Sequence, residues 1–143
     1  MALSKLYSLY MAVVADHSKS PHHRGILEGV EAVLLNNPTC GDVISLTVDF
    51  DGEIIKNIAF AGDGCTISTA SSSMMTDAVI GKTKAEALEL AEIFSLMIQG
   101  DHKDEDKLGE AKLLAGVSKF PQRIKCATLA WNALKKAIER SEL

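Results

Sequence analysis

The chain has 143 residues, of which 47% are hydrophobic and 24% charged, and its formal net charge is −4. This length fits one domain over residues 1–143 with a sizeable core. Lys and Arg are spread along the chain, so no basic stripe indicates nucleic-acid binding. The apolar stretches are too short to cross a membrane, and residues 1–10 do not have the pattern of a signal peptide. We therefore expect a cytoplasmic protein, in a compartment where thiols stay reduced.

The first predicted element is a helix, because apolar residues recur at helical spacing over residues 3–14. It should end near His17, before the polar loop of residues 21–25. This loop carries the adjacent histidines His22 and His23, which invite a metal interpretation. We favour solvated side chains, because neighbouring donors on a loop rarely converge on one ion unaided.

Strands are predicted next. Residues 30–35 have weak strand character, whereas residues 43–50 alternate apolar and polar side chains as a half-buried strand does. Asp51-Gly52 is a favoured two-residue hairpin turn, and residues 53–61 form the return strand. The two outer ends of an antiparallel hairpin are neighbours, so residues just before and just after this pair should meet.

The second half of the chain is predicted to be helical. Helices are expected over residues 65–79, over residues 83–100 behind a capping box, as a short piece over residues 112–117, and from Phe120 onwards. The acidic loop of residues 101–106 lacks calcium-binding spacing. The predicted fold class is α+β, with a small antiparallel sheet of about three strands packed on one side by helices in a single domain.

The chain contains three cysteines, each placed where a metal ligand would be useful. Cys40 is separated from Asp42 by one glycine, so a thiolate and a carboxylate can converge on one ion. Spacing alone does not separate metal ligands from buried, inert thiols, since no CxxC pair is present. A disulfide is disfavoured by the odd count. The predicted hairpin favours metal binding, because it brings Cys40 and Asp42 to Cys65, and Cys126 lies early in the last helix.

These residues resemble a known family, the U-type iron–sulfur assembly proteins. The resemblance rests on Asn37-Pro38-Thr39-Cys40-Gly41-Asp42, on Gly64-Cys65, on the Ser-rich run of residues 68–75 and on a cysteine at the start of the last helix. The stretch of residues 20–25 is similar to the family's N-terminal Asn-Pro-Arg-Asn-x-Gly, with differences. The match extends over nearly the whole chain.

Within that family the chain looks like the SufU branch. Lys125 precedes Cys126 where the IscU-type scaffold has His, the scaffold's chaperone-recruiting motif is absent, and a segment of about residues 109–120 is added. The resemblance implies a zinc-dependent sulfurtransferase that accepts persulfide sulfur from a SufS-type, pyridoxal-phosphate cysteine desulfurase and acts with downstream cluster-assembly proteins. For Arg123 and Lys125 it implies at most a partner-contact or electrostatic role.

The resemblance also implies the site residues. Cys40 would be the sulfur acceptor, and the zinc ligands would be Cys40, Asp42, Cys65 and Cys126. Two other functions stay open. The same donors suit a scaffold that assembles a [2Fe–2S] cluster and transfers it to apoproteins. A purely structural zinc domain ranks third, because such sites more often use CxxC pairs.

Overall fold

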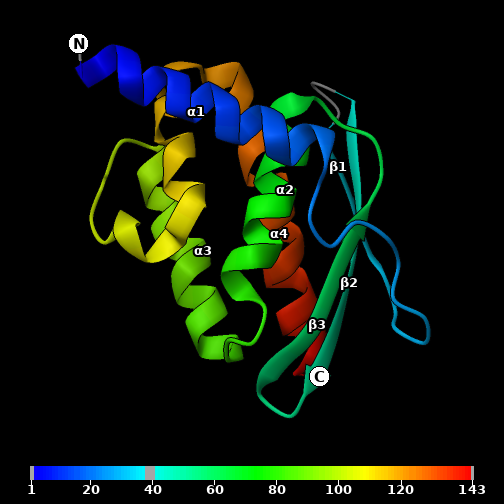
Figure 1. Ribbon diagram of the computed structural model, residues 1–143. Helices are drawn as coiled ribbons and strands as arrows, with labels where there is room; N and C mark the ends of the chain where they lie inside the picture. Colours follow the sequence, from blue (N-terminus) through cyan, green and yellow to red (C-terminus); the bar gives the residue numbers. More distant parts are fainter. Residues whose placement is uncertain (1, 38–40, 143) are drawn as a thin grey trace.

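The computed structural model describes residues 2–37 and 41–142, and of residues 2–10 only the course of the helix (Figure 1). The elements in chain order are α1 (Ala2–Lys19), β1 (Val33–Asn37), β2 (Asp42–Asp51), β3 (Ile54–Ala61), α2 (Thr66–Val79), α3 (Lys84–Ile98), η1 (Glu105–Lys119) and α4 (Pro121–Ser141). None of the helices in this part of the chain is long and apolar enough to cross a bilayer.

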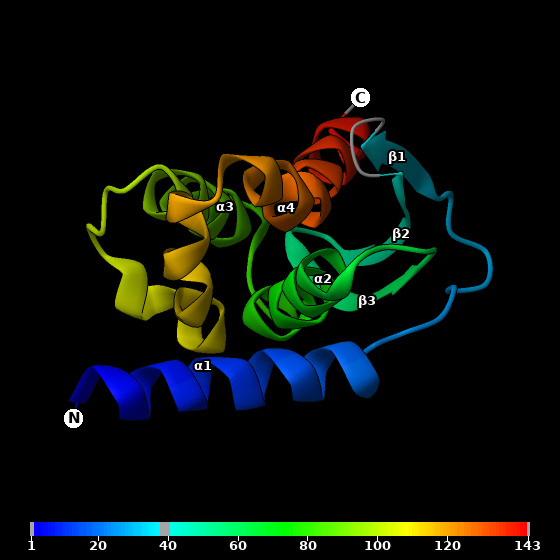
Figure 2. The same cartoon turned by 90° about the horizontal axis from the view of Figure 1, so that it is seen from above.

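The three strands form one antiparallel sheet in the order β1-β2-β3. Along β2, Ile44, Leu46 and Val48 are buried at alternate positions, as the sequence pattern predicts. The helices gather on one side of the sheet, with α4 against β1 and β2 and α2 against β3 (Figures 1 and 2). The α+β prediction, with about three strands covered on one side by helices, is therefore confirmed.

The hairpin turn lies one residue later than predicted. Asp51 pairs with Ile54, so Gly52 and Glu53 form the turn, and Gly52 adopts a positive φ of 62°. A register shift, typical of a β-bulge, also interrupts the pairing between Asp49 and Phe50. The first strand is also displaced from residues 30–35 to β1.

The segment before the last helix is more helical than predicted. The sequence suggested a charged loop and a short helix over residues 112–117, but η1 begins at Glu105, with a break at Gly109 (φ 62°). Its buried residues recur largely every third position: Leu108, Ala111, Leu114 and Val117. That period matches the three residues per turn of a 3₁₀ helix, which explains why a search for a 3.6-residue period identifies only part of it.

Small side chains on α2 allow it to pack closely on α4. Ser71 is fully buried, and its hydroxyl donates to the carbonyl oxygen of Ala127 at 2.5 Å. This contact indicates that the serine-rich run of α2 serves as a packing face rather than as a source of nucleophiles. Deeper in the helical layer, Trp131 stacks on Phe94 with ring centroids 4.6 Å apart. The α2–α4 contact matters most for the site, because each helix carries one of the cysteines near its start.

A bulky residue at Ser71 should separate the two helices. We expect Ser71→Leu to lower the free energy of unfolding by about 1–3 kcal/mol through overpacking, and Ser71→Ala to lower it by about 1 kcal/mol through loss of one buried hydrogen bond. Urea unfolding followed by circular dichroism measures both. Glu92→Leu introduces the same side chain at an exposed position of α3 and serves as the control. Equal effects of the two leucine variants would contradict this account of the packing.

Candidate metal centre

The fold brings three of the predicted ligands together. Asp42 is the first residue of β2, Cys65 follows the end of β3 by four residues, and Cys126 lies in the second turn of α4. One ligand atom from each of these residues lies within 4.8 Å of the other two. The expectation that the hairpin joins Asp42 to Cys65 agrees with this geometry, and the start of α4 brings in Cys126.

Cys40, the fourth predicted ligand, lies outside the described residues, so its position stays a prediction. The structure describes the chain up to Asn37 and again from Gly41. Gly41 donates its N–H to the carbonyl oxygen of Asn37 at 2.8 Å, and Asn37 pairs with Asp42 across β1 and β2. Gly41 has a positive φ of 76°, a conformation that glycine adopts readily. Asp42 therefore enters the site from the end of the β1–β2 pair.

Asp42 is a buried carboxylate whose hydrogen bonding is incomplete. Asp42 is only 1% exposed, and its Oδ1 accepts the N–H of Cys65 at 2.9 Å. The other oxygen, Oδ2, has no hydrogen-bond partner among the residues that the structure describes. A buried, unpaired carboxylate oxygen is costly. A cation coordinated by Oδ2 would offset this cost, so the donor set fits a bound metal ion.

Cys65 occupies the N-cap of α2. Its Sγ accepts the N–H of Ser68 at 3.4 Å, and its own N–H is held by Asp42. The first turn of a helix presents unpaired N–H groups and the positive end of the helix dipole, both of which stabilise negative charge. Cys65 is half-buried, so its sulfur is placed between the protein interior and solvent.

Two glycines make this close approach possible. Gly62 has a φ of +123°, and a Cβ built on it would overlap the carbonyl oxygen of Val43. At Gly64 a Cβ would lie 2.9 Å from Oγ of Ser68 and 3.3 Å from Oδ1 of Asp42. A side chain at either position would therefore push the loop before Cys65 away from the start of β2.

Cys126 is almost fully buried. Near its Sγ lie the side-chain amide of Asn37 and the carbonyl oxygen of Gln122, each at 3.9 Å. The contact from Asn37 was not foreseen from the sequence. The one indication of this contact in the sequence is the expected pairing of the strands. Asn37 stands opposite Asp42, and residues opposite each other in a sheet share a face, so Asn37 also faces the site. Arg123 and Lys125, on either side of this cysteine in the chain, are exposed.

The loop histidines are solvent-accessible, as expected from the sequence, but their rings also contact other residues. Nδ1 of His22 lies 2.5 Å from Oδ2 of Asp77, and Nδ1 of His23 lies 3.0 Å from Oγ1 of Thr76. Both rings therefore contact α2, although both remain partly exposed. Buried His17 lies beside them, with its ring centroid 4.6 Å from that of His22.

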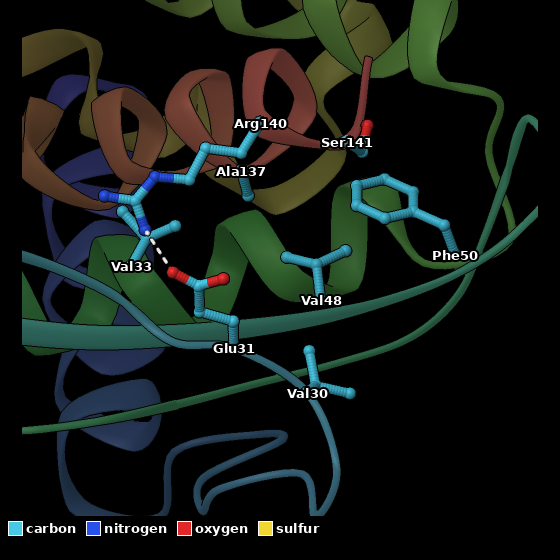
Figure 3. Close-up of a pocket in the computed structure, with 8 residues that line it drawn as sticks. All are labelled: Val30, Glu31, Val33, Val48, Phe50, Ala137, Arg140 and Ser141. Carbon is cyan, nitrogen blue, oxygen red and sulfur yellow. Dashed lines mark ion pairs between the residues drawn. The ribbon is translucent and has the colours of Figure 1, made fainter. Parts of the chain in front are cut away.

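A surface hollow at the far end of α4 has none of this chemistry (Figure 3). The described residues that line it are mostly apolar, with Val33, Val48 and Phe50 from the sheet. Its one ion pair, between Arg140 and Glu31 at 3.7 Å, joins two exposed side chains, and such pairs contribute little. The convergence of thiols and a carboxylate makes the cysteine cluster the candidate functional site.

Comparison with known proteins supports the same conclusion. The sequence profile of the NifU-like N terminal domain matches residues 9–127. The chain belongs to this family. It is 78% identical to the iron–sulfur cluster assembly scaffold protein IscU of Streptococcus pyogenes serotype M1, over 99% of this chain and 89% of that protein. It is 49% identical to the zinc-dependent sulfurtransferase SufU of Bacillus subtilis strain 168, over 97% and 95%.

A solved structure agrees in fold. FiSufU, a protein of the SUF system of thermophilic Fervidobacterium islandicum AW-1, superposes with a TM-score of 0.82 at 36% identity, covering 88% of this chain and 93% of FiSufU. The predicted family is therefore confirmed, and the chain is a member of the iron–sulfur cluster assembly proteins. The relatives carry both the scaffold name and the sulfurtransferase name.

Replacing Asp42 tests whether its carboxylate, with the unpaired oxygen Oδ2, is a metal ligand. Asp42→Asn keeps the size of the side chain but removes its charge, so we expect zinc affinity to fall at least tenfold while the fold is retained. Competition with a coloured chelator measures the affinity. Asp63→Asn removes an exposed carboxylate from the same loop region and should leave zinc affinity unchanged. Unaltered affinity in Asp42→Asn would exclude this carboxylate as a ligand.

Proposed function

We propose that this chain is a zinc-dependent sulfurtransferase of iron–sulfur cluster assembly, which accepts persulfide sulfur from a SufS-type cysteine desulfurase. The observation that carries the proposal is the compact group of Asp42, Cys65 and Cys126, in which the buried Oδ2 of Asp42 has no hydrogen-bond partner among the described residues. The zinc ligands would be these three residues and Cys40, which only Gly41 separates from Asp42 in the chain.

The spacing of the donors suits a single ion. Ligand atoms of a tetrahedral zinc site with sulfur at about 2.3 Å lie about 3.8 Å from one another. The three described donor atoms lie within 4.8 Å of one another, so small movements suffice to enclose one ion. A [2Fe–2S] cluster uses the same kinds of ligand, divided between two irons. The spacing therefore suits zinc but does not by itself separate zinc from a cluster.

Bound zinc would keep the cysteine thiols deprotonated at neutral pH. In the proposed transfer, the Cys40 thiolate attacks the terminal sulfur of the desulfurase persulfide. The sulfur–sulfur bond of the persulfide breaks, the terminal sulfur becomes a persulfide on Cys40, and the desulfurase cysteine leaves as a thiolate. No external oxidant or reductant is required.

The burial of the cysteines supports Cys40 as the acceptor. Cys126 is 1% exposed, so a partner's persulfide cannot approach it without rearrangement. Cys65 is held by the first turn of α2 and is half-buried. Gly41, next to Cys40, is exposed, so the chain reaches the surface at that point.

Exposed Arg123 and Lys125 add positive charge near the start of α4, where they would attract an anionic persulfide or an acidic partner surface.

The second candidate function is a scaffold for a [2Fe–2S] cluster. The 78% identity to a protein named IscU favours it. In the scaffold function, the same thiolates would ligate iron, and zinc would only occupy the cluster site. A test of the proposal must therefore measure sulfur transfer and not only metal content, because thiolate sites also acquire zinc adventitiously.

The deciding experiment follows alanine formed from cysteine by a SufS-type desulfurase, with and without the zinc-loaded protein. We expect strong stimulation by the wild type and none by Cys40→Ala, because the acceptor thiol is gone. Mass spectrometry should find the transferred sulfur on Cys40. Full stimulation by Cys40→Ala would overturn the proposal.

A second variant separates the acceptor from the other ligands. Cys65→Ala removes a predicted zinc ligand but retains Cys40, so stimulation should fall while any transferred sulfur is still found on Cys40. If the zinc-loaded wild type gives no stimulation, and iron and sulfide instead build a cluster that passes to an apoprotein, the scaffold function is the correct one.

A further inference from the structure

A second group of metal-type ligands lies on the helical side of the molecule, outside the cysteine cluster. His17 near the end of α1, His22 in the following loop and Asp77 in α2 each place one ligand atom within 4.8 Å of the other two. The loop joins α1 to the sheet and passes over α2, which is why residues 55 positions apart meet here. The cysteine function uses none of these residues.

The hydrogen bonds around His17 determine which of its nitrogens can bind a metal. Nε2 lies 3.0 Å from a carboxylate oxygen of Glu110, which can only accept, so Nε2 carries the proton. On the other side of the ring, the Ser73 hydroxyl accepts the N–H of His22 at 2.8 Å and lies 2.7 Å from Nδ1. In neutral His17, Nδ1 is therefore the acceptor nitrogen; it accepts the Ser73 hydroxyl, and a metal ion at Nδ1 would replace that hydrogen bond.

This arrangement resembles the surroundings of ligating histidines in metalloproteins. Such histidines commonly donate their second ring N–H to a carboxylate, which orients the ring and raises its basicity. Glu110 fulfils that role for buried His17. Asp77 is already 2.5 Å from Nδ1 of His22 and 3.4 Å from Nδ1 of His23. A ligand atom of Asp77 also lies within 4.8 Å of one from His17 and one from His22, so the three side chains can share one cation.

We propose that His17, His22 and Asp77 form a second metal site, which binds a divalent first-row transition metal such as Zn²⁺, Co²⁺ or Fe²⁺. Two imidazoles and one carboxylate with open coordination positions suit these metals, whereas the absence of thiolate among the three disfavours Cu⁺. The side chains of His22 and Asp77 are 43% and 37% exposed, so an ion can enter from solvent and water can complete its coordination.

The second site would be separate from the cysteine cluster. Cys65 caps the start of α2, whereas Asp77 lies twelve residues later, about 18 Å along the helix at 1.5 Å per residue. The two sites therefore need not share a metal ion. They also differ in their donors, since one supplies sulfur and the other imidazole nitrogen. Spectroscopy can consequently distinguish an ion in one site from an ion in the other.

The test uses the full-length protein with its cysteine site already loaded with zinc. We expect calorimetric titration with Zn²⁺ to show a further equivalent bound, and either His22→Asn or Asp77→Asn to weaken that step at least tenfold. His102→Asn is the matched control, because His102 also pairs with a carboxylate, Glu105, at 2.7 Å on the exposed surface of η1. His102→Asn should bind the further equivalent of Zn²⁺ as tightly as the wild type does.

Co²⁺ identifies the donors. Added to the zinc-loaded protein, Co²⁺ should broaden the ring signals of His17 and His22 in ¹⁵N-histidine spectra, leave His102 unchanged and give no thiolate-to-cobalt charge-transfer band. The proposal is overturned if no further equivalent binds, if binding persists in both His22→Asn and Asp77→Asn, or if the cobalt spectrum shows thiolate ligation. Circular dichroism of both variants, whose altered residues are partly exposed, verifies that they are folded.

Discussion

The hydrogen bond from the Cys65 N–H to Oδ1 of Asp42 closes the β2–β3 hairpin at its open end. It joins the first residue of β2 to the cap of α2, and the second oxygen of the same carboxylate is buried without a hydrogen-bond partner among the described residues. The rest of the site depends on this closure. Without it, the half-buried thiol of Cys65 and the buried thiol of Cys126 would lie on two helices with no common partner.

Much of this arrangement could be predicted from the sequence. The alternation in β2 locates the hairpin, and hairpin ends must meet, so the proximity of Asp42 and Cys65 follows from the pattern. The approach of Cys126 could not be derived in this way, because it depends on how closely α4 packs on α2. That distance is set by small residues such as Ser71, whose buried hydrogen bond crosses between the helices.

Other features of the structure are not indicated by the local sequence. The exact turn residues and the register shift between Asp49 and Phe50 depend on how the strands pair rather than on composition. The extent of η1 was underestimated because its apolar residues follow a period of three. The contacts of His22 with Asp77 join residues far apart in the chain, so a dipeptide of histidines on a loop gives no indication of them.

The two groups of ligands suggest a division of tasks within one small protein. The cysteine cluster combines thiols with one carboxylate whose second oxygen lies in the interior, a donor set that suits zinc. The histidine group is harder, more exposed and supported by Glu110 and Ser73. The relatives carry both the scaffold name and the sulfurtransferase name, so sulfur transfer has to be measured on this chain itself.

The central claim is that Cys40, Asp42, Cys65 and Cys126 hold one zinc ion. Zinc X-ray absorption on protein loaded with one equivalent tests it most directly. The account predicts three sulfur ligands at about 2.3 Å and one oxygen at about 2.0 Å, with no second metal nearby. A first shell of nitrogen and oxygen alone, or a metal–metal distance typical of a cluster, would contradict it.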